Sequence, residues 1–243
     1  MYTSTRWGRA GIAGALVLAL WACGPSAEEK QKQEMAAKRQ TDWAWLQSAK
    51  KTLDAKRAEL TQVTTGGGSN AALEAEVGKL TEEFGGRLVD YINGAEILEG
   101  QKPTGDALES IRMKSGEDIV LAREYIEKGG EFQRAIDILE QSLNVDPDNA
   151  DLRRELDKAK AHRYPTPEEW ARLKKGMTEK EVRDILGPVN LRNIKDYPDK
   201  GVVAWFYKKE AGGAAAVFFD KKKDGQLHAY DLKWEAVKAG ENE

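Results

Sequence analysis

The chain has 243 residues, of which 33% are charged and 8% are aromatic, and its formal net charge is −3 at pH 7. Charges of both signs, with no basic stripe interleaved with aromatic residues, argue against nucleic-acid binding. A single cysteine has no partner for an intrachain disulfide, so the cores must be held by ordinary packing.

The first 22 residues have the layout of a secretory signal. Two arginines precede an apolar run from Gly11 to Trp21, which is shorter than the ~20 residues of a membrane-spanning helix. The run ends in Leu20-Trp21-Ala22-Cys23-Gly24, which resembles the lipobox of bacterial lipoproteins. The resemblance implies that Cys23 is lipidated and is the first residue of the mature chain. The alternatives are an ordinary signal peptide and a buried free thiol.

Residues 23–40 are polar and are expected to form a tether, partly flexible and partly helical. Gly24 stands where enteric lipoproteins that stay at the inner membrane carry aspartate. The lipoprotein resemblance therefore implies an outer-membrane location, with the chain facing the periplasm. A lipidated cysteine carries two or more acyl chains, which anchor far more firmly than one.

Residues 41–163 are predicted to form a helical domain. Two apolar stripes, from Leu46 to Val63 and from Leu73 to Leu98, flank a glycine-rich turn and predict an antiparallel helical hairpin. Gly85, Gly86 and Gly94 lie in its second helix, where they weaken the helix and indicate a kink or a close helix crossing. Three further helices are predicted over 106–128, from about 132 to 143, and over 149–162.

The pattern Gly130-x-Phe132-x-x-Ala135-Ile136-x-x-Leu139-x-x-x-Leu143-x-x-Asp146-Pro147 resembles the second half of a tetratricopeptide repeat. In such a repeat the small Ala135 allows close helix approach and Pro147 sets the next turn. The resemblance implies a repeat unit at about 117–147 and a surface that binds proteins. A plain helical hairpin is the alternative.

Residues 166–238 are predicted to form a small α+β domain. Two capping boxes, Thr166 with Glu169 and Thr178 with Glu181, begin two short helices. The apolar period then falls to two over 201–207, 214–219 and 227–234, which predicts a three-stranded antiparallel sheet with His228, Tyr230, Leu232 and Trp234 alternating along the last strand. Residues 191–194 are a candidate fourth, irregular strand.

The run Lys175-Gly176-Met177-Thr178-x-x-x-Val182-x-x-x-Leu186-Gly187 resembles the SmpA/OmlA (BamE-like) domain of envelope lipoproteins. Trp205-Phe206-Tyr207, Phe218-Phe219-Asp220 and the turn Asp224-Gly225 continue the likeness in order over about 65 residues. The resemblance implies the fold of a barrel-assembly lipoprotein and support of outer-membrane protein insertion.

The sequence contains no motif that predicts catalysis, a metal site or a cofactor site. His162 and His228 have no metal-ligand companion at helical or hairpin spacing, and His228 is expected to pack or hydrogen-bond at the sheet surface. The cluster Lys221–Lys223 is expected to form a solvated turn, and the alternative is that these lysines contact phosphate headgroups. Trp43 and Trp45 are expected either to dock on a membrane or partner, or to pack against Leu80 or Phe84.

These patterns predict a lipid-anchored, non-enzymatic scaffold that binds envelope proteins, with the barrel-assembly machinery as the partner implied by resemblance. The alternative is an exported inhibitor-like or sensory module that binds an envelope enzyme or a wall polymer.

Overall fold

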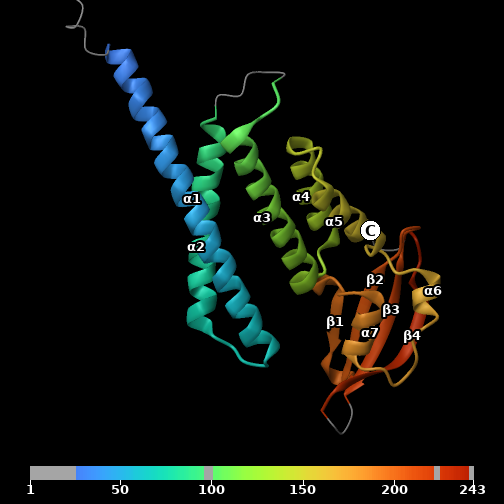
Figure 1. The fold of residues 1–243 in the computed structure, drawn as a ribbon. Coiled ribbons are helices and arrows are strands. Elements are labelled where there is room, and N and C mark those ends of the chain that lie inside the picture. The colour runs from blue at the N-terminus through green and yellow to red at the C-terminus, as the bar shows by residue number, and fades with distance from the viewer. Residues whose placement is uncertain (1–25, 96–100, 222–224, 241–243) are drawn as a thin grey trace, which may run out of the picture. The chain divides into compact units, whose positions relative to one another are not determined.

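The computed structural model describes residues 26–95, 101–221 and 225–240 and shows the α+β fold that the sequence predicts, with helices preceding the sheet (Figure 1). The chain divides into two compact units, one that extends to Arg87 and one that begins at Leu88. The boundary between these units lies within the second helix. The division between 163 and 166 stays a prediction.

The first unit is an antiparallel pair of helices, α1 (Ala27–Thr65) and α2 (Ala71–Asn93), of which α2 continues into the second unit. Three contacts establish the antiparallel arrangement, because residues later in α1 meet residues earlier in α2. They join Trp45 to Arg87 at 4.0 Å, Arg57 to Thr81 at 3.2 Å and Lys56 to Glu76 at 2.7 Å. The predicted hairpin and its stop after Thr65 are confirmed.

The residues expected to form a tether are largely helical. Ser26 caps α1 through a capping box with Glu29, and residues 26–38 are exposed on all sides. A helix that is polar all round needs side-chain pairs for support. Glu28 and Lys32 supply one, at 2.9 Å, in the favourable order with the acid nearer the N-terminus. Residues 23–25 lie outside the described residues.

The glycines of α2 do not mark a close crossing. A Cβ atom at Gly85 or Gly86 would meet nothing within 4 Å, so both positions face open space. Gly94 follows the last helical residue, Asn93, so α2 ends before the predicted Leu98; residues 96–100 are outside the described part of the chain.

The second unit begins its own core with α3 (Gly105–Gly129), α4 (Phe132–Val145) and α5 (Ala150–Ala161). The small residues Ala122 and Ala135 are 2% and 0% exposed, which allows α3 and α4 to approach closely. The buried core of these helices consists of Ala122, Ala135, Ile136, Leu139, Leu152, Leu156 and Ala159.

A buried polar network fixes the register of these helices. Ser142 on α4 donates to Asp118 on α3, while Ser115 on α3 and Asn149 both donate to Asp146 at 3.1 and 2.7 Å. Buried carboxylates are tolerated only when hydrogen-bonded in this way. The network therefore fixes how the α4–α5 turn sits on α3.

The α+β part follows with α6 (Pro167–Trp170), α7 (Glu179–Leu186) and the 3₁₀ turns η1 (Leu191–Asn193) and η2 (Pro198–Lys200). Both capping boxes are present as predicted. The sheet contains β1 (Ile194–Tyr197), β2 (Val202–Lys208), β3 (Ala214–Lys221) and β4 (Leu227–Val237) in the order β1-β2-β3-β4, all antiparallel. Its buried core consists of Leu173, Val182, Leu186, Val189, Trp205, Tyr207, Val217, Phe219 and Ala229.

Two sequence predictions for the sheet need correction. The sheet of the described residues has four strands rather than three, and the candidate fourth strand expected at 191–194 is β1 at Ile194–Tyr197, because residues 191–193 form the turn η1. The simple alternation along β4 also fails, because Phe218 pairs with Asp231 while its neighbour Phe219 pairs with Ala229. The extra residue, Tyr230, is a bulge that changes which face the later residues occupy.

Candidate functional site: a groove between the helices and the sheet

The residue predicted to carry the lipid, Cys23, lies outside the described residues, as do Lys222 and Lys223. His162 ends α5, with its Nδ1 atom 2.9 Å from the carbonyl oxygen of Lys158. His228 Nδ1 lies 2.9 Å from the carbonyl oxygen of Gly176, so this histidine hydrogen-bonds at the sheet edge as expected. The guanidinium of Arg87 lies over the ring of Trp45, 4.0 Å from its centroid.

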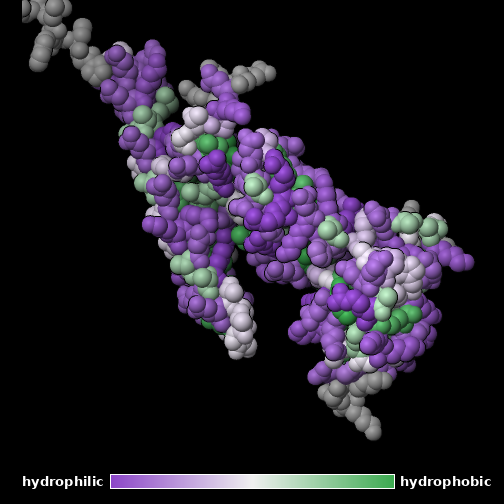
Figure 2. Space-filling view, turned by 45° about the vertical axis from the view of Figure 1, so that its right-hand side comes forward, coloured by the Kyte–Doolittle hydropathy of each residue, from purple (hydrophilic) through white to green (hydrophobic). Residues whose placement is uncertain are grey.

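The ranges 26–95, 101–221 and 225–240 contain no group of three or more His, Cys, Asp or Glu side chains able to hold a metal ion. Within the same ranges, no helix combines the length and the apolar character needed to cross a bilayer. Hydrophilic residues cover most of the face shown in Figure 2, with small apolar patches between them.

A close backbone contact in the second unit joins the helices to the sheet. Gly130, which ends α3, has a φ angle of +60°, and a Cβ atom there would lie 2.4 Å from the carbonyl oxygen of Val189. Asn190 adds a side-chain hydrogen bond to the carbonyl of Gly130 at 3.4 Å. Only glycine satisfies both the left-handed backbone and the close approach, so Gly130 sets the distance between the α3–α4 turn and the segment that precedes β1.

Beside this contact lies an open groove of about 500 Å³, within the size range of ligand-binding pockets. Its walls come from the start of α4, the linker after α5, the segment between α7 and β1, and the end of β2. Apolar lining is provided by Phe132, Leu186, Pro188, Val189 and Pro165. Because its lining combines apolar and charged side chains, the groove can hold a chain segment that carries both kinds of group.

The groove has an excess of positive charge. Arg134, Arg163, Arg192 and Lys208 line it, against the two acids Glu131 and Asp137. Arg134 is already engaged by Glu131 at 3.7 Å and by the ring of Tyr125 at 4.1 Å. No described acid lies within ion-pair distance of Arg163, Arg192 or Lys208. Arg163 also lies over the ring of Tyr164, 4.6 Å from the ring centroid. The wall therefore carries three cations that no described acid neutralises.

Tyr207 forms part of the groove from the core side. Its hydroxyl donates to the carbonyl of Gly187 at 3.4 Å, and burial raises the pKa of this phenol well above its ordinary value. The charge of Arg183 lowers the pKa, but its effect is smaller than that of burial. Tyr207 therefore stays neutral and serves as a hydrogen-bonding wall rather than as a charged group.

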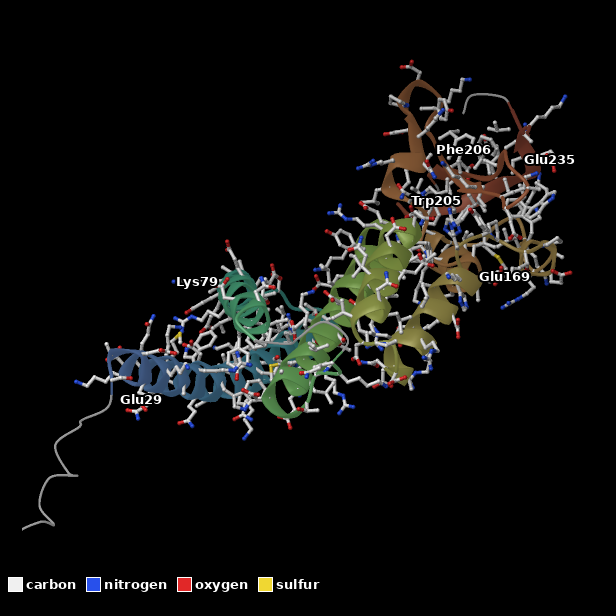
Figure 3. All side chains as sticks on the ribbon, turned by 90° about the horizontal axis from the view of Figure 1, so that it is seen from above. Glu29, Lys79, Glu169, Trp205, Phe206 and Glu235 are labelled. Atoms are coloured by element: carbon white, nitrogen blue, oxygen red, sulfur yellow. The ribbon has the colours of Figure 1, made fainter. Side chains whose placement is uncertain are left out.

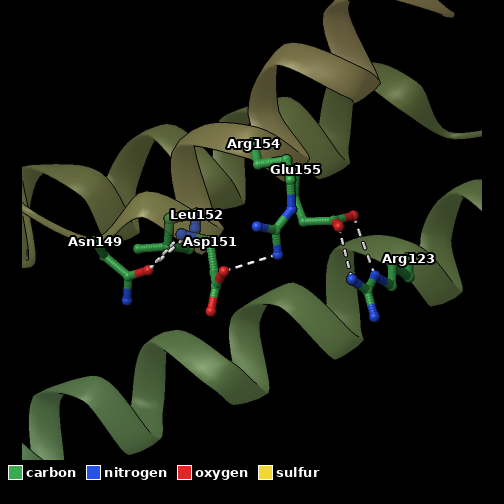
Figure 4. Close-up of polar contacts among 6 residues, drawn as sticks. All are labelled: Arg123, Asn149, Asp151, Leu152, Arg154 and Glu155. Atoms are coloured by element: carbon green, nitrogen blue, oxygen red, sulfur yellow. Dashed lines mark hydrogen bonds and ion pairs between the residues drawn. The ribbon is translucent and has the colours of Figure 1, made fainter.

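One ion pair holds the helix that leads into the groove. Arg123 on α3 donates two hydrogen bonds to Glu155 on α5, at 3.1 and 2.6 Å (Figure 4). The bidentate hydrogen bonding raises the pKa of Arg123 and lowers that of Glu155. The pair links α3 to α5, whose last residue, Ala161, directly precedes the linker that lines the groove.

The face of the sheet opposite its core carries a row of aromatic rings. Figure 3 marks Phe206 beside Trp205 on β2. The rings of Phe206 and Phe218 are 6.3 Å apart, as are those of Phe218 and Tyr230, and Tyr230 is 39% exposed. Lys195 lies over Phe206 at 5.3 Å and Lys233 over Phe218 at 5.4 Å. The row thus crosses three strands and has cations above two of its rings.

The chain has no match among protein-family models, curated proteins or solved structures.

Sequence reasoning did not find the groove. Its lining comes from segments as distant as Gly130 and Lys208, and no single segment carries a periodic signal for it. The sequence places Gly130 at a helix stop and at the start of a repeat-like pattern, and neither feature predicts its contact with Val189. Two adjacent glycines after a helix are a signal for a close approach, but they do not identify the residue that approaches.

Proposed function

We propose that this chain is a lipid-anchored, non-enzymatic adaptor of a Gram-negative cell envelope, facing the periplasm from the outer membrane and binding partner proteins. The observation that carries the proposal is the segment Leu20-Trp21-Ala22-Cys23-Gly24, placed directly before a capped helix that begins at Ala27. The resemblances to tetratricopeptide repeats and to the BamE-like domain support a protein as the ligand, and the latter implies support of outer-membrane protein assembly.

The structure offers a physical route for partner binding. The groove beside Gly130 is lined by two separate parts of the second unit, and its three cations without a described acid partner are available to a ligand. A partner held there would contact the helices and the sheet together. Such a site suits an adaptor, whose task is to position one protein relative to a surface.

The anchor is tested by replacing Cys23 with serine and fractionating cells that express the full chain. The expected result is loss of palmitate labelling and release of the protein from the membrane fraction. A matched variant, Ser26→Ala, removes a nearby hydroxyl while leaving the thiol and should label normally. Protein that still labels and stays with membranes in the Cys23→Ser variant would contradict the proposal.

The partner is tested by crosslinking in intact envelopes followed by purification of the full chain. Co-purification of barrel-assembly subunits is the expected result. The second candidate, a sensory module for a wall polymer, is favoured by one observation, the aromatic row of Phe206, Phe218 and Tyr230 with its lysines. Retention of the chain on purified wall polymer, lost in a Phe218→Ala variant, would support that candidate instead.

A further inference from the structure

The edge strands of the sheet are β1 and β4. The start of β4 is covered by the segment before α7, since Gly176 donates to Ala229 at 2.7 Å and Ala229 donates to Met177 at 2.7 Å. The opposite edge belongs to β1, which has only four residues, Ile194–Tyr197, including Lys195 and Asp196. Short, charged edge strands discourage pairing with another chain.

The end of β2 is different because β1 does not reach it. The first residue of β1, Ile194, pairs with Trp205, so residues 206–208 extend beyond β1. Among the residues the structure describes, no backbone hydrogen bond joins Lys208 to the segment before β1. The same three residues, Phe206, Tyr207 and Lys208, line the groove.

The register shows which backbone groups face the groove. Lys209 donates to Gly213 at 3.1 Å across the β2–β3 turn, so position 209 bonds toward β3. Antiparallel ladders alternate between bonded and non-bonded pairs. Lys208, opposite Ala214, therefore directs its N–H and C=O away from β3 and toward the groove. The carbonyl of Phe206, also in a non-bonded pair, points away from β3 for the same reason.

We propose that the groove binds an extended, acidic segment of a partner protein, which adds to β2 beside Phe206 and Lys208 as a continuation of the β1 position. The exposed backbone groups of β2 favour an extended strand as ligand, because a strand can hydrogen-bond to both the N–H and the C=O of Lys208. The cations Arg163, Arg192 and Lys208 specify acidic side chains. The apolar lining residues accept the side chains that alternate with the acidic ones. This inference rests on the proposed adaptor function and identifies the chemistry of its partner.

The probe is a short fluorescein-labelled peptide in which glutamate and valine alternate, titrated into the purified full chain and followed by fluorescence anisotropy. We expect binding that weakens as salt screens the cations, and no binding of the matched lysine and valine peptide. Peptides methylated at alternate backbone nitrogens decide the mode. Methylation in the register that faces β2 should abolish binding, and methylation in the other register should leave it intact.

Variants of the chain give a second reading. Lys208→Pro removes the backbone donor and is expected to weaken binding about tenfold, the equivalent of one hydrogen bond. Lys208→Gln keeps the donor and removes the charge, so it should lower the salt dependence while preserving the preference between methylation registers. Lys200→Gln, at an exposed lysine that does not line the groove, is the charge-matched control and should bind as the wild type does.

Three results would overturn the inference. One is equal binding of both methylated peptides, which would leave only a non-specific electrostatic surface. Another is wild-type affinity in a folded Lys208→Pro variant. A third is self-association in sedimentation that Lys208→Pro abolishes, which would assign the edge to a second copy of the chain. If the peptide does not bind but envelope partners are still captured, strand addition is excluded and the adaptor function stands. If the wild-type chain is neither lipidated nor bound to envelope partners, the adaptor function is excluded.

Discussion

The contribution of an ion pair to stability depends on how exposed its side chains are to solvent. Two ion pairs near α5 illustrate this (Figure 4). In the pair between Arg123 and Glu155, the glutamate side chain is 12% exposed and joins two helices that are distant in sequence. In the pair between Arg154 and Asp151, the side chains are 67% and 66% exposed and belong to one helix. Solvent screening reduces the second pair far more than the first.

Replacing Glu155 with glutamine is therefore expected to lower the free energy of unfolding by roughly 1 kcal/mol, because one charge-assisted, bidentate contact between α3 and α5 is lost. Arg154→Gln is the matched control, and it should change stability by less than about 0.5 kcal/mol. Urea denaturation followed by circular dichroism at pH 7 measures both. Equal effects of the two substitutions would contradict this ranking.

The same pair predicts a pH dependence. Hydrogen bonds from Arg123 lower the pKa of Glu155, and burial only partly opposes them. A folded-state pKa below the unfolded value means that the unfolded chain binds more protons in this range, so stability rises with pH. The contribution is present above the ordinary glutamate pKa of about 4.3 and is lost as pH falls through the lowered folded value. Urea midpoints for wild type and Glu155→Gln should thus converge on acidification, and a constant difference down to about pH 2 would contradict the prediction.

Gly130, just after α3, and Gly116, within α3, should respond to alanine with opposite signs. Gly130→Ala places a Cβ atom 2.4 Å from the carbonyl oxygen of Val189 at a φ of +60°, and should destabilise by about 2 kcal/mol or more. At Gly116, in the middle of α3, a Cβ atom meets nothing within 4 Å, so alanine should stabilise by roughly 0.5–1 kcal/mol. Thermal unfolding measures both, and a neutral Gly130→Ala would show that the α3–α4 turn does not rest on the segment before β1.

At the scale of elements, capping decides where short helices begin. The helix α7 has eight residues and starts at a threonine whose Oγ1 accepts from the backbone N–H of Glu181. Thr178→Ala should therefore cost about 1 kcal/mol. Thr61→Ala, at an exposed threonine within α1, is the control; it should be neutral or slightly stabilising because alanine favours helix interiors. Chemical denaturation of both variants provides the measurement, and equal losses would contradict a capping role.

The elements with strong local signals were predictable from the sequence. The caps at Thr166 and Thr178, the stop after Thr65 and the start of α5 at Asn149 all depend on residues within one turn of the boundary. The bulge at Tyr230 was not predictable, because it is a property of the pairing between β3 and β4. The groove was missed for the same reason, since Gly130 meets Val189 only after the chain has folded.

At the scale of the whole molecule, each unit has buried residues of its own, and α1 reaches beyond what it buries. The first buried residue of α1 is Leu46, whereas the helix begins at Ala27. The fully exposed part runs from Ala27 to Lys38, which at about 1.5 Å per residue extends roughly 18 Å. Cys23 lies a few residues before Ser26, the cap of this helix. In the proposed adaptor, this arm would separate the lipid from the first packed residues.

The arm and the packed part of α1 should therefore respond differently to proline, which costs about 3 kcal/mol in a helix interior. Ala36→Pro lies in the exposed arm, where the preceding turns can unwind without uncovering any buried side chain. It should lower helical ellipticity and leave the thermal midpoint unchanged. Ala49→Pro lies between the buried Leu46 and Leu53, so helix and core must be lost together, and the midpoint should fall. A midpoint lowered equally by both substitutions would show that the arm is part of a cooperative fold rather than an extension from it.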